Sequence, residues 1–191
     1  MQLSKRLQAV ADLAERAVCI ADVGTDHGYI PIYMVKNGLA RHAVAMDINE
    51  GPLLRAQHNI RAYGLEDRIV TRLSDGLAEL GKGEADTVVI AGMGGQLTVH
   101  ILTCGEHALA EAEKLVLQPQ SEIFLVRRYL ADHGFRIVKE TIVFEDGKYY
   151  PMMQVRHREE GGEAEAYSPA ELEFGKHLIP ECLPVWKDFL N

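Results

Sequence analysis

The sequence predicts an α/β protein built on a doubly wound sheet that is mostly parallel and has an antiparallel strand near one edge. Short apolar segments alternate with amphipathic segments along residues 4–133, which is typical of parallel strands joined by helices. The first apolar segment runs through Asp22 into a turn with Gly24 and Gly28, and a helix follows with a proline in its first turn. Two extended segments then flank an Asp-Gly pair at 146–147, which indicates an antiparallel hairpin.

Capping residues, prolines and glycines delimit the expected elements. Ser4 is a candidate N-cap of the first helix, Pro52 stands at the first position of a later helix, and Ser121 caps the last helix of the alternating region. Ser168 and Glu171 form a capping box that begins a C-terminal helix. We expect helices over 4–17, 29–37, 52–63, 97–102 and 121–133, and strands over 18–21, 43–48, 69–73, 87–91, 115–117, 135–144 and 149–155.

Length and composition predict one main domain with a short C-terminal segment. The chain has 191 residues, of which 47% are hydrophobic, and no apolar run approaches the ~20 residues that span a bilayer. Residues 1–158 are expected to form the α/β domain, and residues 159–191 an acidic linker and the start of a helical domain. Because no segment near the N-terminus resembles a signal peptide, the expected location is the cytoplasm.

Cysteine and charge patterns exclude some classes of site. Cys19, Cys104 and Cys182 are far apart and have no metal-ligand spacing, so we expect buried free thiols and no metal. The net charge of −8 is concentrated in residues 159–191, which hold eight acids and two lysines. The remainder is near neutral, so a local basic face that binds nucleic acid stays possible.

Carboxylates at the predicted strand ends indicate the type of cofactor. Asp22 and Asp26 flank the first glycine turn, and like charges about 4 Å from a pyrophosphate would cost several kcal/mol. The sulfonium and ammonium groups of S-adenosylmethionine would instead be stabilised there, although Asp26 could also serve only as a helix cap. Asp47 is placed to accept ribose hydroxyls, and Asp75 the adenine amino group, with Leu77 against the ring. The candidate cofactor-binding residues are Asp22, Gly24, Thr25, Gly28, Asp47, Ile48, Asp75, Gly76, Ala91 and Gly92.

Two further strand ends are candidate contacts for a substrate. Three glycines in the four residues 92–95 indicate close approach to a ligand, although a plain loop is the alternative. Gln118, Pro119 and Gln120 offer amide donors and acceptors that suit the edge of a base.

Four stretches together resemble the bacterial tRNA (adenine-22 N1)-methyltransferases. They are residues 22–32 (DVGTDHGYIPI), 90–95 (IAGMGG), 117–120 (LQPQ) and 145–150 (EDGKYY). The resemblance implies a Rossmann-like class I methyltransferase fold, S-adenosylmethionine as cofactor and methylation of a D-arm adenine of tRNA. It also implies a helical C-terminal domain, of which residues 168–191 are the opening. Gln120 stands where an asparagine is expected in this family.

Adenine N1 is a neutral nucleophile, so alignment and desolvation matter more than a general base. N1 lies on the Watson–Crick edge, so the base must be unpaired before it reacts. We expect Asp26 or His27 to accept a hydrogen bond from the N6 amino group, although His27 could be purely structural. Tyr29 either stacks on the base or packs the helix. The candidate catalytic residues are Asp26, His27, Tyr29, Met93 and Gly94.

The expected partner is tRNA, bound by a monomer or weak dimer. Candidate phosphate contacts are basic side chains in the N-terminal half, and each could equally belong to a solvated helix face. They are Lys5, Arg6, Arg55, Arg61, Arg68 and Arg72, of which Lys5 and Arg6 join Gln118, Pro119 and Gln120 as candidate substrate residues. Two other functions stay open: a small-molecule methyltransferase, which the acidic balance would suit, and a noncatalytic nucleotide-binding module.

Overall fold

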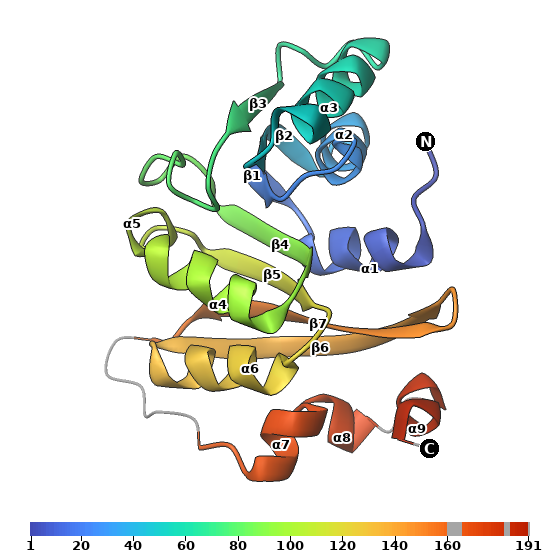
Figure 1. Ribbon diagram of the computed structural model, residues 1–191, viewed down its shortest axis with the longest axis vertical. Coiled ribbons are helices and arrows are strands. Elements are labelled where there is room, and N and C mark those ends of the chain that lie inside the picture. The colour runs from blue at the N-terminus through green and yellow to red at the C-terminus, as the bar shows by residue number, and fades with distance from the viewer. Residues whose placement is uncertain (160–165, 182–183, 191) are drawn as a thin grey trace.

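The computed structural model describes residues 1–159, 166–181 and 184–190. Seven strands form one mixed sheet in the order β3-β2-β1-β4-β5-β7-β6 (Figure 1). β1 to β5 are parallel, while β7 pairs antiparallel with both β5 and β6. The predicted doubly wound sheet is confirmed. The strands are β1 Ala17–Val23, β2 Ala40–Asp47, β3 Ile69–Leu73, β4 Thr87–Met93, β5 Lys114–Pro119, β6 Phe135–Glu145 and β7 Lys148–His157.

Helices cover both faces of the sheet, because the connections from β1 to β2, β2 to β3 and β4 to β5 each carry a helix across it, whereas residues 74–86 join β3 to β4 without one. α1 to α3 pack on one face, where Ile20, Val89 and Val116 are fully buried. α4 to α6 pack on the other face over Val88, Ile90 and other strand residues of opposite alternation. The helices are α1 Lys5–Ala14, α2 Tyr29–Lys36, α3 Glu50–Ala62, α4 Gly95–Cys104, α5 Glu106–Leu109 and α6 Ile123–Asp132.

Three short helices follow the sheet and lie along α6 and β6 (Figure 1). They are α7 Pro169–Phe174, α8 Leu178–Glu181 and α9 Pro184–Leu190. The predicted capping box is present, since Ser168 accepts from Glu171 N and the Glu171 carboxylate accepts from Ser168 N. The division of the chain into domains at residue 158 stays a prediction.

Several local predictions differ from the structure. α3 begins at Glu50, so Pro52 is its third residue, and α5 was not predicted. Ser121 does not cap α6: the helix follows Glu122, which adopts a left-handed conformation with φ 49°. Cys19 is half-buried and Cys104 is exposed, which corrects the prediction of buried thiols. Cys182 lies outside the described residues.

The described ranges contain neither a membrane-spanning helix nor a cluster of metal ligands. No helix among them combines the length and apolarity needed to cross a bilayer. Within the same ranges, no group of three or more His, Cys, Asp or Glu side chains is arranged to hold a metal ion.

Candidate active site

The site lies where the strand order reverses, between β1 and β4. These strands run parallel with Asp22 opposite Val89 and Val23 opposite Ile90. This register places the loop after β1 beside Ala91 and Gly92 at the end of β4. In open α/β sheets such a switch point opens a crevice at the carboxyl ends of the strands.

The loop after β1 requires glycine at two positions. Gly24 has φ +75°, and a Cβ there would collide with the Met93 side chain. Gly28 has φ +68°, and a Cβ there would lie 3.2 Å from the Cβ of Ala56 on α3. The amides of Gly24 and the next residue both donate to the Met46 carbonyl at 2.8 Å, which fixes the loop against β2. The tight turn therefore keeps backbone atoms, not side chains, at the floor of the crevice.

Two cavities open at this edge of the sheet, and Gly24 lines both of them. The first has a volume of about 330 Å³ and the second about 190 Å³. Asp22 and Asp26 line the first, and Asp47 and Asp75 line the second. An elongated ligand with cationic and hydroxyl groups could therefore extend from one cavity to the other across Gly24.

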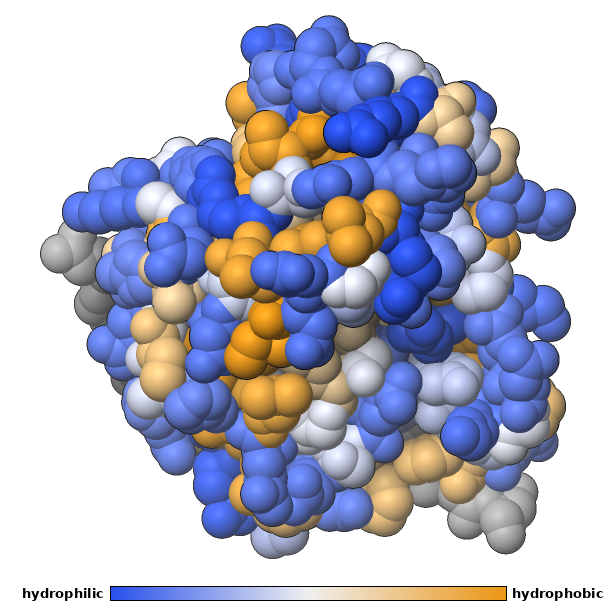
Figure 2. All heavy atoms as spheres, turned by 45° about the horizontal axis from the view of Figure 1, so that its top comes forward, coloured by the Kyte–Doolittle hydropathy of each residue, from blue (hydrophilic) through white to orange (hydrophobic). Residues whose placement is uncertain are grey.

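The second cavity combines carboxylates with apolar walls. Asp47 closes β2 and Asp75 follows β3, as predicted, and the cavity includes Ile48 and Leu97. These two residues are 58% and 48% exposed, and Figure 2 shows apolar surface gathered in a band on the visible face of the molecule. Leu77 does not line this cavity because it is buried in the core. The walls suit a flat ring between apolar side chains, with Asp75 near its edge.

Asp22 is the most perturbed acid of the site. Asp22 is only 6% exposed, and this burial raises the pKa of its carboxyl to about 6. The Thr25 hydroxyl lowers this pKa, and the negative charge of Asp47 raises it further. The Thr25 Oγ1 atom is itself buried and makes no hydrogen bond of good geometry within the described chain. Because Asp22 lines the first cavity, its buried carboxylate favours a ligand that brings a cation.

The outer rim of the first cavity is formed by the residues around Asp26. The Asp26 Oδ1 atom accepts from Arg55 Nη2 at 2.9 Å and from Arg55 Nε at 3.2 Å, and lies 3.6 Å from His27 Nε2. The His27 and Tyr29 rings are stacked, with centroids 5.1 Å apart and planes 7° apart. Asp26 keeps a side-chain exposure of 61%. The rim therefore presents a carboxylate and two parallel rings to a substrate.

The predicted substrate residues separate into two groups. Gln120 is exposed and lines the first cavity together with Arg6. Gln118 and Pro119 are buried in β5, and Gln118 reaches the site only through its hydrogen bond from Arg6. Lys5 is exposed and uses its backbone amide to donate to Glu145.

Other predicted residues lie elsewhere. Met93 lines the second cavity, so it contacts the side of the crevice away from the Asp26 rim. Gly94 caps α4 and faces Ser121. Arg72 forms a two-pronged ion pair with Glu84 at 2.6 and 2.7 Å, so its charge is already satisfied. Arg61 is exposed on α3, and Arg68 is half-buried just before β3.

Apart from Ile48, Ala91 and Met93, sequence patterns missed the apolar part of the site. Leu7 and Ile30 line the first cavity, and Leu97 and Ile101 the second. Leu97 and Ile101 are four residues apart on α4, so helical periodicity places them on one face. No local signal shows which apolar residues of a helix face a crevice and which face the core.

The sheet order, the switch-point crevice and its carboxylate-lined cavities define the class of protein as a class I methyltransferase. Residues 3–153 match a family described as a methyltransferase domain. The tRNA (adenine(22)-N(1))-methyltransferase of Bacillus subtilis (strain 168) is 40% identical over 180 residues, which are 94% of this chain and 74% of that protein. The chain belongs to the family of tRNA (adenine(22)-N(1))-methyltransferases.

Solved structures show the same architecture. A Streptococcus pneumoniae protein in complex with S-adenosyl-L-methionine is 38% identical with a TM-score of 0.92, over 99% of this chain and 86% of that chain. The M. capricolum protein TrmK, in complex with the cofactor product S-adenosyl-homocysteine, is 32% identical with a TM-score of 0.81, over 92% of this chain and 76% of that chain.

Proposed function

We propose that this chain methylates N1 of an adenine at position 22, in the D-arm of tRNA, with S-adenosylmethionine as methyl donor. The observation that carries the proposal is the pair of cavities joined at Gly24, each lined by carboxylates and one bordered by the Asp26 rim. The family relationship specifies the substrate, because the Bacillus subtilis relative is named for adenine 22 of tRNA.

The residues present fit this cofactor. Asp22 lines the first cavity and offers a buried carboxylate for its ammonium. The predicted contact Thr25 lines neither cavity. Asp47 is placed for the ribose hydroxyls and Asp75 for the adenine amino group. When bound, S-adenosylmethionine supplies an electrophilic methyl group on a sulfonium. Gly24, Gly76, Ala91 and Gly92 bring the backbone close to it, and Ile48 lines the second cavity. The predicted contact Gly28 lines neither cavity and packs against Ala56 instead.

The rim residues orient the target base. The Asp26 carboxylate keeps one oxygen, Oδ2, free of hydrogen bonds from Arg55, so it can accept from the adenine N6 amino group. The stacked His27 and Tyr29 rings offer a flat surface at the cavity mouth. A carboxylate beside the methylated base also stabilises the positive charge that develops there. No general base is needed at N1, because its lone pair is free at neutral pH.

Binding of the surrounding tRNA is assigned to exposed basic side chains near the rim. Arg55 lies beside Asp26, and Arg61 follows on the last turn of the same helix. Gln120 adds an amide at the mouth of the first cavity. We infer that the protein works in the cytoplasm, where tRNA is modified, and that it acts as a monomer or weak dimer.

The deciding experiment is methylation of unmodified tRNA transcripts with labelled methyl donor, followed by mass spectrometry of the nucleosides. We expect 1-methyladenosine, and its loss when position 22 carries guanine. Label that appears only in small molecules would support a small-molecule methyltransferase instead. Binding of the cofactor product without any transfer would support a noncatalytic nucleotide-binding module.

A further inference from the structure

Arg6 occupies an unusual place in the first cavity. Its Nη1 atom donates to the Oε1 atom of Gln118 at 3.0 Å, and Gln118 is completely buried. The guanidinium carbon lies 5.5 Å from the centroid of the Tyr150 ring. A Cβ built on Gly92 would come within 3.6 Å of the same Nη1 atom. The guanidinium is therefore held beside the end of β4, between β5 and β7.

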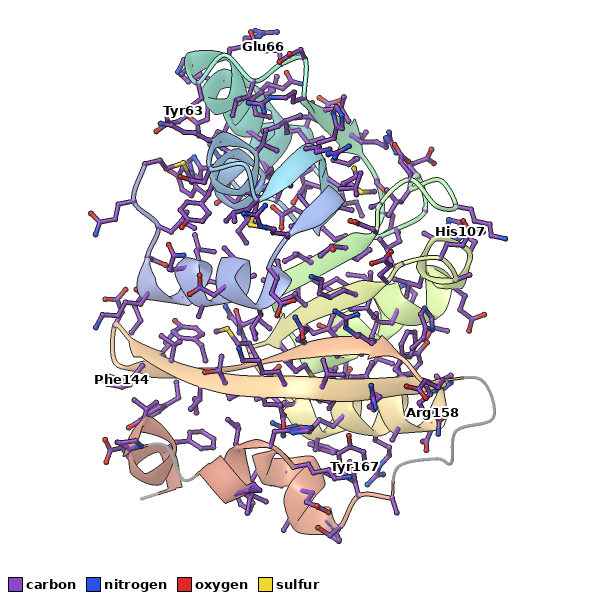
Figure 3. All side chains as sticks on the ribbon, turned by 180° about the vertical axis from the view of Figure 1, so that it is seen from behind. Tyr63, Glu66, His107, Phe144, Arg158 and Tyr167 are labelled. Carbon is purple, nitrogen blue, oxygen red and sulfur yellow. The ribbon has the colours of Figure 1, made fainter. Side chains whose placement is uncertain are left out.

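The backbone of Arg6 is fixed as well. The Glu145 carboxylate, at the end of β6, accepts from Lys5 N at 2.6 Å and from Arg6 N at 3.3 Å. Figure 3 shows the hairpin tip, marked by Phe144, next to the first turn of α1. The hairpin thus caps the N-terminus of α1 from a distance of about 140 residues along the chain. Arg6 is positioned by separate elements before any ligand arrives.

The Arg6 guanidinium forms no ion pair in the described ranges, although its charge helps to lower the pKa of the Glu145 carboxyl. Arg55, Arg72 and Arg127 each form an ion pair there, but Arg6 does not. A guanidinium has five N–H donors, and the described residues accept one of them through Gln118. A fixed, half-buried cation with free donors at a cavity wall is suited to an oxyanion.

Asp22 lines the same cavity, so the cavity presents both a carboxylate and a guanidinium. The amino-acid end of S-adenosylmethionine carries an ammonium and a carboxylate on one carbon. We propose that Arg6 binds this carboxylate while Asp22 binds the ammonium, an inference that rests on the proposed function. It replaces the sequence-based assignment of Arg6 to a tRNA phosphate. The neighbours of Arg6 favour the cofactor over a tRNA phosphate as its ligand. Gly24, Ala91 and Gly92 line the cavity with Arg6, whereas the exposed rim is formed by Asp26 and Tyr29.

Two ligands that differ only at the amino-acid end test the assignment. S-adenosylhomocysteine carries the carboxylate, and 5′-methylthioadenosine lacks the whole amino-acid group. For Arg6→Gln we expect the Kd of S-adenosylhomocysteine to rise at least about tenfold, which corresponds to about 1.4 kcal/mol. The Kd of 5′-methylthioadenosine should stay within about twofold. Arg6→Lys should recover part of the loss, because an ammonium keeps the charge but not the forked geometry.

Calorimetry on the full chain gives both constants, and Arg41→Gln is a matched control. Arg41 is exposed on β2, so its removal changes the net charge equally without touching the cavity. If Arg6→Gln raises the Kd of both ligands by the same factor, the assignment is overturned. It is also overturned if this variant keeps its affinity for S-adenosylhomocysteine and binds tRNA more weakly. If the wild-type chain binds neither ligand, the proposed function fails. If it binds both equally well, the assignment of Arg6 fails while the proposed function stands.

Discussion

At the scale of the residue, Asp22 shows how a group proposed to bind the cofactor lowers the stability of the ligand-free protein. The usual pKa of an aspartate is 3.8, and burial raises that of Asp22 to about 6. The folded state therefore holds this proton more tightly than the unfolded state does. Between about pH 4 and pH 6 the stability contributed by this group falls as the pH rises, and above pH 6 the full cost of a buried charge is present.

Asp22→Asn should therefore stabilise the ligand-free protein at pH 8. The gain is expected to reach up to about 3 kcal/mol, and to vanish near pH 4, where the wild-type carboxyl is protonated. Urea denaturation at both pH values measures this difference. The same variant should bind S-adenosylhomocysteine more weakly at pH 8, because a neutral amide replaces the partner of the ammonium. A variant that is less stable than wild type at pH 8 would contradict this account.

Asp26 differs from Asp22 because it is exposed and already paired with Arg55. Its proposed role is to orient the target base, not to bind the cofactor. Asp26→Ala should lower the single-turnover rate of methyl transfer at least about tenfold, with the Kd of S-adenosylhomocysteine within about twofold. Asp26→Asn keeps an acceptor oxygen and should recover part of the rate. Rapid-quench measurements decide the point, and full single-turnover transfer by Asp26→Ala would refute the role.

At the scale of the element, α7 is attached to the sheet through a buried ion pair. Arg127 on α6 and Glu140 on β6 each keep a side-chain exposure of 1%, with Nε and Oε1 at 2.8 Å. Arg127 Nη1 also donates to the carbonyls of Leu172 and Glu173 at the end of α7. Gly175 follows with φ +94°, and a Cβ there would come within 2.9 Å of Arg127 Nη2. One guanidinium thus joins α6, β6 and α7.

Removing one partner of this pair should be costly. Arg127→Met leaves the Glu140 charge buried without its partner, and we expect the free energy of unfolding to fall by about 3–5 kcal/mol. The double variant Arg127→Met/Glu140→Met should lose less, because no uncompensated charge remains. Urea denaturation compares the variants, and the Kd of S-adenosylhomocysteine verifies that the distant site is intact. A loss below about 1 kcal/mol for the single variant would show that the pair contributes little.

At the scale of the whole molecule, local patterns predicted the sheet class and several elements well. The turn from Asp22 to the start of α2, the strand β3 over residues 69–73, the hairpin and the Ser168 capping box each depend on neighbouring residues, and each is present. Sequence patterns also identified the carboxylates at the strand ends, because strand ends of a parallel sheet meet at one edge.

Contacts between distant segments could not be predicted in this way. Nothing near Glu145 shows that its carboxylate caps α1, and nothing near Arg72 shows that Glu84 neutralises it. Leu77 and Leu97 are both apolar residues that follow a strand, yet one is buried in the core and the other lines a cavity. The position of β7 between β5 and β6 likewise follows from packing in three dimensions.

Long-range contacts distinguish two arginines that were both predicted from the sequence as candidate phosphate contacts. Arg61 is exposed on α3 and forms no ion pair in the described ranges, whereas Arg72 is paired with Glu84. If the exposed face of α3 binds tRNA, Arg61→Gln should raise the Kd for tRNA about two- to fivefold and reduce the salt dependence of binding by the equivalent of about one phosphate contact. Arg72→Gln should leave that salt dependence unchanged. Filter binding across a salt series measures both, and equal slopes for the two variants would exclude this face of α3 as a tRNA contact.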